Sequence, residues 1–533
     1  MTAVPRVLAV GDAAVSVEFG DTLDPVLNAC VRGLDRALAA APVPGQIESV
    51  PSHRALLVLY EPGVVRFVEI RDELLRRAAA VVPSAAEPGA PRSVPTRYGG
   101  TDGPDLARVA ARLGLTEAEV VRLHASGEYT AFMLGFMPGF AYLGMLPEAL
   151  ATPRLETPRV RVPAGSVAIA GRQTGIYPVA SPGGWNVIGR TSLRLFDPAA
   201  DPPARILPGD RVRFVASQTL PEPPPTTPPP THGAPAVLEI LEPGLLTTVQ
   251  DAGRRGYRRL GVSWAGALDA PALRAANALL GNDPQAAALE CTLAGPALRF
   301  LATTHFAVTG ADLSPVLQRE DLGAWPVPAE ARILARAGNI LRFSGRRWGC
   351  RAYLAVAGGI DVPPLLGSRS TDLGSGFGGF AGRALRAGDR LAVGQPPGLP
   401  PTSPERPTTQ GPADPALVRV VLGPQHQHLD PASLIRFLAE PYAVSAASDR
   451  VGCRLAGPPL AHRGAAEIVS DGMSPGSIQV PPDGQPIVML ADGPTTGGYP
   501  KVATVVSADL PRLAQLVPGV DTLRFVAVGP GEA

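Results

Sequence analysis

Two stretches of this 533-residue chain follow the same pattern. Residues 165–185 read GSVAIAGRQTGIYPVASPGGW, and residues 476–499 read GSIQVPPDGQPIVMLADGPTTGGY. Each begins with Gly-Ser, continues through two apolar strand-like runs separated by a turn, and ends in Gly-Gly and an aromatic residue. Shared β-turn habits would also produce such a likeness. We interpret the two stretches as one supersecondary unit that occurs in two related β-barrels.

The composition supports a multidomain, mainly β protein. Apolar residues make up 45% of the chain, but aromatic residues only 5%, so the cores must be aliphatic. The 59 glycines and 61 prolines imply many tight turns. A length of 533 residues exceeds a single core and indicates two to four domains.

The charge pattern and the apolar runs exclude several classes of partner. The net charge of +1 gives no electrostatic footprint for nucleic acid or for an acidic membrane. No apolar run approaches the ~20 residues of a membrane helix, and the N-terminus lacks the pattern of a signal peptide. We therefore expect a cytoplasmic protein. The four scattered cysteines form no CxxC pair, so neither a disulfide framework nor a zinc site is indicated.

Changes in composition divide the chain into six parts. Residues 1–90 read as strand, helix, two strands and helix, which indicates a ferredoxin-like α+β module. One helix, Ala270–Leu280, interrupts the β-type runs of the second half. The remaining parts are a barrel over 94–217, a Pro-rich linker over 218–235, a first barrel lobe over 236–395, a second Pro-rich linker over 396–416, and a second barrel lobe over 417–529.

Lys501 is the only lysine among the 48 basic residues of the chain. A lone lysine in an arginine background suggests a position where a compact ammonium group cannot be replaced by a planar guanidinium. It ends the stretch DGPTTGGYPK, residues 492–501, which combines a carboxylate, two hydroxyls and glycines. Such a stretch is typical of a loop that binds an oxyanion or phosphate. A tight turn with a surface lysine is the structural alternative.

A second group of candidate residues lies in the first half. Arg172 and Gln173 follow a glycine, and Arg190 follows another. Glycine lets the backbone approach a ligand closely, and arginine offers a planar fork of donors to a carboxylate or phosphate. The chain has no phosphate loop of the GxxxxGK[ST] type, no GxSxG elbow and no HExxH motif. No resident metal site is predicted.

Long, ordered motifs resemble the small subunits of the bacterial ATP-dependent 5-oxoprolinase family. GFMPGFAYLG at 135–144, RVPAGSVAIAGRQTGIYP at 161–178 and SPGGWNVIGRT at 181–191 resemble the B subunits, which are also named after allophanate hydrolase subunit 1 and a sporulation kinase inhibitor. A second set of motifs resembles the C subunits: TTVQDAGRRGY at 247–257, GALDAPALRAANALLGN at 266–282, GGIDVPPLLGSRST at 358–371, SDRVGCRL at 448–455 and DGPTTGGYPKV at 492–502. The chain is therefore similar to a fusion of both small subunits.

This resemblance implies a fold and an activity. It implies cyclophilin-like β-barrels in both halves, beside the α+β module, and a relation to the carboxyltransferase domain of urea carboxylase. In the family, the two small subunits act with a TIM-barrel-like third subunit of the LamB/YcsF type. Together they convert 5-oxoproline, ATP and water to glutamate, ADP and phosphate. ATP, with Mg²⁺, is thus the expected cofactor. Assembly of several copies of the chain into a homo-oligomer remains an alternative.

The resemblance also suggests roles for the candidate residues. Lys501 and Asp492 are expected to be catalytic and to meet a phosphoryl group. The residues expected to bind the substrate are Phe140, Arg172, Gln173, Gly183, Gly184, Arg190, Thr495, Thr496, Gly497, Gly498 and Tyr499. Two other functions remain open at this point: a carboxyltransferase or amidolyase of the urea–allophanate type, and a non-enzymatic regulator of a histidine kinase.

Overall fold

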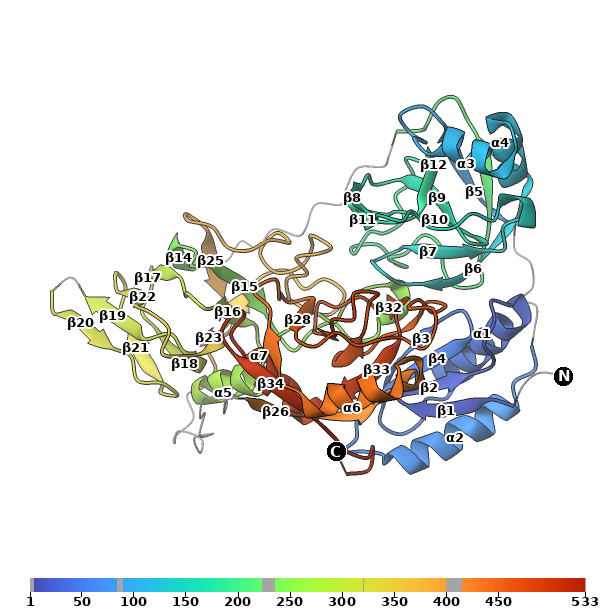
Figure 1. Ribbon diagram of the computed structural model, residues 1–533. Helices are drawn as coiled ribbons and strands as arrows, with labels where there is room; N and C mark the ends of the chain where they lie inside the picture. Colours follow the sequence, from blue (N-terminus) through green and yellow to red (C-terminus); the bar gives the residue numbers. More distant parts are fainter. Residues whose placement is uncertain (1–3, 84–89, 223–234, 320, 399–414, 533) are drawn as a thin grey trace.

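The computed structural model describes residues 4–83, 90–222, 235–319, 321–398 and 415–532. Most of the two predicted Pro-rich linkers lies outside these residues. In the described part, strands dominate, and two seven-stranded sheets close into barrels (Figure 1). The predicted fold class, mainly β with an N-terminal α+β module and a barrel in each half, is confirmed. Every helix in these ranges is too short or too polar to span a bilayer.

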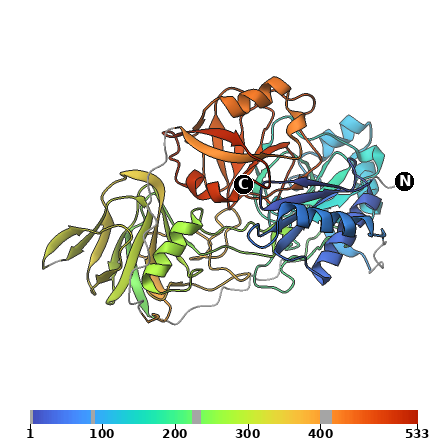
Figure 2. The same ribbon diagram turned by 90° about the horizontal axis from the view of Figure 1, so that it is seen from below.

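The N-terminal module is a four-stranded antiparallel sheet with two helices packed on one face (Figure 2). The sheet order β1-β2-β4-β3 is that of a ferredoxin-like sheet whose last strand comes first in the chain. Helix α1 begins where the Asp24 side chain accepts a hydrogen bond from the Val26 N–H. The elements are β1 (Arg6–Ala9), β2 (Ala14–Glu18), α1 (Pro25–Ala40), β3 (Gln46–Pro51), β4 (Ala55–Tyr60) and α2 (Phe67–Ala79).

The N-terminal barrel follows this module and forms the upper part of Figure 1. Its strands are β5 (Arg92–Tyr98), β6 (Tyr129–Leu134), β7 (Ala141–Gly144), β9 (Ser166–Ala170), β10 (Gln173–Ile176), β12 (Asn186–Arg190) and β13 (Arg211–Ala216). Outside the barrel lie α3 (Leu106–Leu113), α4 (Glu117–Ser126), the short 3-10 helix η1 (Glu148–Leu150), and the strand pair β8 (Arg159–Val162) and β11 (Ser181–Gly183). Thr116 caps α4 by accepting a hydrogen bond from the Glu119 N–H.

The first lobe of the second half differs from the predicted barrel, because its strands form two open sheets. Each sheet buries one face against the other sheet around a shared apolar core. Two sheets that pack in this way bury their apolar faces without closing into a barrel. One sheet holds β14 (Ala236–Glu242), β17 (Ala297–Phe300), β19 (Pro315–Arg319), β20 (Gly323–Pro326), β22 (Ile340–Phe343), β24 (Ile360–Asp361) and β25 (Arg390–Val393). The other holds β15 (Leu246–Gln250), β16 (Ala288–Thr292), β18 (Thr304–Asp312), β21 (Ile333–Ala335) and β23 (Trp348–Val356).

The C-terminal barrel completes the molecule. Its strands are β26 (Ala416–Leu422), β27 (Tyr442–Val444), β28 (Gly452–Ala456), β30 (Ser477–Gln479), β31 (Ile487–Met489), β33 (Lys501–Val505) and β34 (Thr522–Ala527). A separate pair is formed by β29 (Asp471–Gly472) and β32 (Thr496–Gly497). The short 3-10 helices of the second half are η2 (Arg258–Leu260), η3 (His426–His428) and η4 (Ser507–Asp509).

The prediction of one helix in the second half was too low. Helix α5 (Ala270–Leu280) has the predicted bounds, and the described residues add α6 (Pro431–Ala439) and α7 (Leu510–Ala514). Helix α6 is held at its start by Asp430, whose side chain accepts hydrogen bonds from two backbone N–H groups, and by a proline in its first turn. Both added helices are short, so they leave a weak periodic signal in the sequence.

The two barrels have the same strand order. The order runs β5, β12, β9, β10, β7, β6, β13 in the first barrel and β26, β33, β30, β31, β28, β27, β34 in the second. In each barrel the first and last strands of this series pair in parallel, and the other pairs are antiparallel. The two Gly-Ser stretches of the sequence start equivalent strands, β9 and β30. The barrels are therefore two copies of one topology, as the repeated stretch indicates.

Candidate functional site

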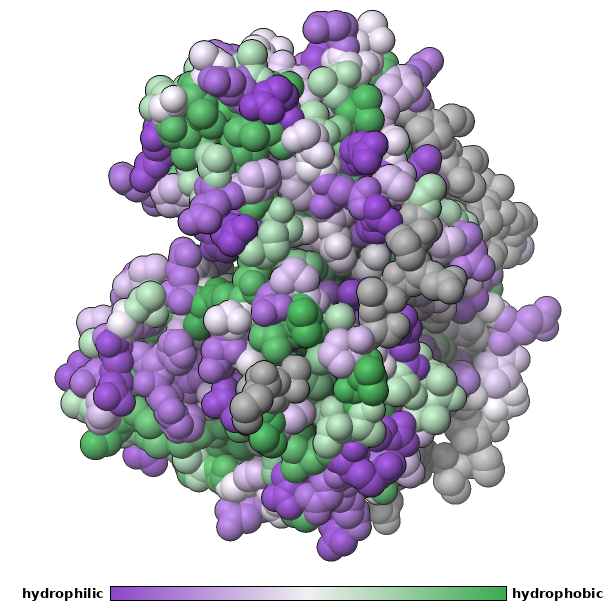
Figure 3. All heavy atoms as spheres, turned by 90° about the vertical axis from the view of Figure 1, so that its right-hand side faces the viewer, coloured by the Kyte–Doolittle hydropathy of each residue, from purple (hydrophilic) through white to green (hydrophobic). Residues whose placement is uncertain are grey.

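The two barrels and the N-terminal module meet at one place. Seen as filled spheres, the molecule is hollowed where the N-terminal barrel, at the top, joins the rest (Figure 3). The Phe136 N–H of the first barrel donates to the Thr496 hydroxyl of the second at 3.0 Å. Ser52, in the turn between β3 and β4, donates to Asp471 of the C-terminal barrel at 3.0 Å. We take this junction as the candidate site.

Lys501 forms a buried ion pair at the junction. Its Nζ lies 2.9 Å from Oδ2 of Asp471, and the two side chains are 1% and 2% exposed. Burial alone would raise the pKa of the Asp471 carboxyl, but Lys501 and Arg54 outweigh burial and keep that pKa below its ordinary value. Gln425 braces the pair, because its Oε1 accepts from the Lys501 N–H at 3.1 Å. The pair is thus charged and rigidly held.

His53 lies beside this pair and is fully buried. Burial lowers its pKa to about 3, against an opposing effect of Asp471, so the imidazole is neutral at physiological pH. One ring nitrogen lies 2.9 Å from the Gln173 amide, and Nδ1 has no partner among the described residues. Asn28 of α1 fixes the turn, because its amide donates to the carbonyls of Ser52 and Phe132, both at 3.1 Å. A neutral imidazole with an open nitrogen can exchange a hydrogen bond with a ligand.

Aromatic rings of the N-terminal barrel form a wall of the junction, and the Tyr142 ring meets the His53 ring edge-on at a centroid separation of 5.6 Å. Phe140 contacts four rings edge-on, with centroid separations of 4.8 Å to Tyr142, 5.2 Å to Tyr177 and 5.7 Å to both Trp185 and Phe136. Tyr142 is buried, which raises the pKa of its phenol, and its hydroxyl hydrogen-bonds with Thr496 and Ser470 of the C-terminal barrel. An apolar wall with hydroxyl groups at its edge suits a small ring that carries an amide.

The predicted glycine turn lies at the same junction. A Cβ on Gly497 would come within 2.3 Å of the Gln479 amide nitrogen, so a larger residue there would displace the Gln479 side chain. That amide donates to the Tyr499 carbonyl at 3.1 Å and holds the turn. The Thr495 hydroxyl is buried and has no hydrogen-bond partner within the part of the chain that the structure describes. An orphaned hydroxyl next to a tight turn is available for a bound ligand.

The predicted arginines have other surroundings. Both Arg172 and Arg190 are exposed. Two guanidinium nitrogens of Arg172 lie 3.4 Å from the Leu146 carbonyl, and Arg190 lies 3.9 Å from Asp102 and donates to the Ala164 carbonyl. These contacts lie within the N-terminal barrel, whereas Gln173 reaches His53 at the junction.

The two glycines predicted beside the first aromatic corner pack against their own barrel. A Cβ on Gly183 would come within 2.3 Å of the Tyr177 hydroxyl oxygen. The Gly184 carbonyl accepts a hydrogen bond from the Leu155 N–H at 2.7 Å. These glycines allow close packing around the aromatic wall.

Asp492 does not pair with Lys501, beside which it was predicted. Its two carboxylate oxygens accept hydrogen bonds from Arg450 at 2.9 and 3.0 Å, and both side chains are buried. Arg450 also pairs with Glu290 of the first lobe. Burial acts to lower the pKa of Arg450, but the two carboxylates outweigh it and raise that pKa. Asp492 therefore belongs to a buried bridge between the first lobe and the C-terminal barrel.

Several residues at the junction have no local signal in the sequence: Ser52, His53, Gln425 and Asp471. Asp471 lies 419 positions from its partner Ser52 and 30 from Lys501. These residues share no motif and no periodicity, since the packing of the N-terminal module against the C-terminal barrel brings them together. The nearest signal is the lone lysine itself, because a buried ammonium requires a carboxylate partner.

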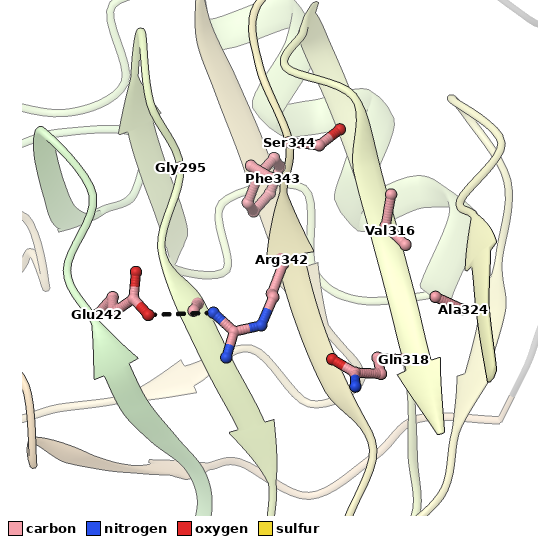
Figure 4. Close-up of a pocket in the computed structure, with 9 residues that line it drawn as sticks. Glu242, Gly295, Val316, Gln318, Ala324, Arg342, Phe343 and Ser344 are labelled. Carbon is pink, nitrogen blue, oxygen red and sulfur yellow. Dashed lines mark hydrogen bonds and ion pairs between the residues drawn. The ribbon is translucent and has the colours of Figure 1, made fainter. Parts of the chain in front are cut away.

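The first lobe carries a hollow of about 290 Å³ on one of its sheets (Figure 4). Its most polar contact is the ion pair between Arg342 and Glu242 at 3.1 Å, and both side chains are largely exposed. The lining residues are Glu242, Gly295, Ala297, Val316, Gln318, Ala324, Arg342, Phe343 and Ser344. The junction residues lie elsewhere and do not line this hollow. Within the described residues, no group of three or more His, Cys, Asp or Glu side chains could hold a metal ion.

The chain belongs to the family of carboxyltransferase domains. The family model "Carboxyltransferase domain, subdomain C and D" matches residues 5–206, and the model for subdomain A and B matches residues 260–527. The resemblance inferred from the motifs is thereby confirmed.

Two relatives correspond to the two halves. The chain is 42% identical over 302 residues to the C subunit of 5-oxoprolinase from Escherichia coli (strain K12), a match covering 56% of this chain and 93% of that protein. It is 44% identical over 214 residues to the B subunit of 5-oxoprolinase from Escherichia coli O157:H7, covering 39% and 95%. The chain therefore unites in one polypeptide two parts that are separate proteins in these relatives.

A solved structure and a eukaryotic relative extend the comparison. The crystal structure of TTHA0988 has a TM-score of 0.84 at 38% identity and covers 96% of this chain and 99% of that one. Urea amidolyase of Lachancea kluyveri is 35% identical over 321 residues, which is 55% of this chain but 17% of that protein. The eukaryotic match thus involves a small part of a much longer enzyme.

Proposed function

We propose that this chain is the fused B and C component of an ATP-dependent 5-oxoprolinase. Relatives bearing the names of these two subunits match over most of their own lengths. The observation that carries the proposal is the junction, where the buried Lys501–Asp471 pair and neutral His53 face an aromatic wall. A small, polar, cyclic amide matches the chemistry of such a site.

The junction supplies groups that opening a lactam requires. In 5-oxoproline the amide lies in an unstrained five-membered ring and resists attack by water. When water adds to the carbonyl carbon and the C–N bond breaks, the departing nitrogen must gain a proton. Lys501 is the group that donates this proton, and Asp471 keeps its amine charged beforehand. Gln173 and His53 orient the amide by hydrogen bonding.

ATP would supply activation of the amide oxygen, with Mg²⁺ bound to its phosphates. The residues first expected to meet a phosphoryl group fit this task poorly, because Lys501 is neutralised by Asp471 and Asp492 by Arg450. The unpartnered Thr495 hydroxyl and the Gly497–Gly498 turn remain suited to an anionic oxygen. We therefore assign these junction residues to the lactam and no residue to the nucleotide.

The lettered names of the relatives imply at least one further subunit, and we propose that the active enzyme forms with it. The decisive experiment mixes the full chain with a candidate third subunit, ATP, Mg²⁺ and 5-oxoproline, and measures glutamate and ADP. We expect both products in equal amounts, and only when both proteins are present. Absence of glutamate with each candidate third subunit would refute the proposal.

A urea-type carboxyltransferase is the second candidate, since a protein named urea amidolyase matches 55% of this chain. The same preparation, given urea and a carboxylated biotin carrier protein, tests it. Urea carboxylation without glutamate formation would favour this second function. Nothing in the junction favours a kinase regulator over either enzyme.

A further inference from the structure

Arg154 stands at the edge of the junction on a fixed backbone. Next to it, Thr152 pairs with Gly171 in an isolated bridge, and the Leu155 N–H donates to the Gly184 carbonyl at 2.7 Å. The Pro153 carbonyl accepts from the Asn186 side chain at 2.8 Å. The main chain is thus tied to the N-terminal barrel on both sides of Arg154, which fixes where its side chain starts.

The guanidinium group of Arg154 reaches across to the C-terminal barrel. A Cβ on Gly498 would lie 3.8 Å from both terminal nitrogens, so the fork lies over the glycine turn. Arg154 is also close enough to Tyr142 and Tyr499 to lower the pKa of each phenol, although burial has the larger, opposite effect. Its ion pair with Glu467 spans 3.7 Å, beyond hydrogen-bond distance, and its side chain is 38% exposed.

The other cations at the junction are already engaged. Lys501 holds Asp471, and Arg54 lies 3.4 Å from Glu18 and donates to the Gly20 carbonyl. Arg159, on the same edge as Arg154, donates to Asp105 at 2.7 Å. Arg154 differs from these groups because its backbone is held in place, its side chain is partly exposed, and its ion pair with Glu467 is long and exposed.

We propose that Arg154 is the specificity-determining residue that binds the carboxylate of the substrate. The inference rests on the proposed function, since 5-oxoproline carries a carboxylate on the ring carbon next to the amide nitrogen. A planar guanidinium binds a carboxylate through two parallel hydrogen bonds. The substrate carboxylate would take the place of Glu467, and the ring would then lie between the aromatic wall and the glycine turn. Arg154 thereby selects an acidic lactam over a neutral one.

Binding of 5-oxoproline to the full chain tests this inference by calorimetry, without ATP or a third subunit. Arg154→Gln is expected to raise Kd about 10- to 100-fold, because a charge-assisted pair is lost. The Kd of Arg154→Lys should lie between those of the wild type and Arg154→Gln, since lysine keeps one point charge. Arg213→Gln is the matched control: Arg213 is also partly exposed with a long ion pair, 3.6 Å to Glu128, on the same barrel. It should bind like the wild type.

Three results would overturn the inference. These are a Kd for Arg154→Gln within twofold of the wild type, an equal loss in the Arg213→Gln control, or no binding of 5-oxoproline to the wild-type chain. Thermal unfolding of each variant shows whether it is folded, and Arg154→Lys serves if Arg154→Gln is not. The proposed function is decided separately by glutamate formation in the assembled enzyme. An active wild type with unchanged binding in Arg154→Gln would therefore refute the role of Arg154 alone.

Discussion

Lys501 and Val187 occupy equivalent positions in the two barrels. Lys501 pairs with Gln479 on β30, and Val187 pairs with Ala168 on β9, the strand equivalent to β30. A register shift adjoins each pair. Val187 is part of the aromatic cluster of the first barrel, whereas Lys501 is charged and bound to Asp471. Two copies of one topology thus present an apolar face and a polar face to the same junction.

This difference makes Lys501 the first residue to test. Lys501→Met leaves the Asp471 carboxylate buried without its cation, which should cost about 3–5 kcal/mol of unfolding free energy. Chemical denaturation measures the loss, and glutamate formation should also be abolished. Lys501→Arg should lose turnover as well, because a buried site shaped for an ammonium does not admit the larger planar group.

A double variant separates stability from catalysis. In Lys501→Met with Asp471→Asn, neither residue is charged, so most of the lost unfolding free energy should return. Turnover should stay absent, since no group is left to donate the proton. Full recovery of turnover in the double variant, or wild-type turnover in Lys501→Arg, would show that the lysine is only structural.

Local signals explain which parts of the fold the sequence predicts. Helix α5 has its predicted bounds, because Asp269 caps its start and Gly281, at φ 69°, ends it. The repeated Gly-Ser stretch likewise marks equivalent strands in both barrels. The two open sheets of the first lobe were missed, because strand patterns alone do not reveal whether a sheet closes.

Local signals do not predict the junction, because tertiary packing brings its residues together. Lys501 stood out through composition, but its partner Asp471 and the braces Ser52 and Gln425 have no sequence pattern that links them. Arg172 was chosen because it follows a glycine, and that glycine, Gly171, lies in the exposed connection between β9 and β10. A residue type beside a glycine indicates a tight turn, and the direction in which the turn faces depends on the whole fold.

Asp492→Asn should affect stability more than chemistry. Asp492 binds Arg450 through both oxygens, and Arg450 also holds Glu290 in the first lobe. Removing one charge from this buried bridge should cost about 3 kcal/mol. Turnover per folded molecule should fall less than tenfold, in contrast to Lys501→Met. Denaturation curves and kinetics on the same preparations make the comparison; a stable but inactive Asp492→Asn protein would restore Asp492 as a catalytic residue.

The buried histidines predict how stability depends on pH. Burial lowers the pKa of His124 to about 3 from its ordinary value of 6.5. Between these values the unfolded chain binds the proton and the folded protein does not, so the free energy of unfolding falls as pH decreases below 6.5. The slope reaches about 1.4 kcal/mol per pH unit for one such group.

Urea unfolding of the full chain at pH 7 and pH 5 measures this slope. His53 has the same lowered pKa, so His124→Gln should remove only part of the acid loss. His428→Gln is the control, because His428 is exposed, and it should keep the wild-type slope. A His124→Gln protein that loses as much stability between pH 7 and pH 5 as the wild type would contradict the assignment.

The two halves should stay together after the chain is cut between them. Buried Glu48 of the N-terminal module accepts from the Arg258 N–H at 3.1 Å and from the Trp264 indole, and Asp35 pairs with Arg259 at 2.8 Å. Both acidic residues belong to the first half and their partners to the second.

With a protease site placed within residues 223–234, the two fragments should co-elute in size-exclusion chromatography after cleavage. Glu48→Arg should separate them, because it places two cations in one buried contact. Glu242→Arg, which alters an exposed pair inside the first lobe, should leave the fragments together; separation of the cleaved wild type would mean that these contacts are too weak to join the halves.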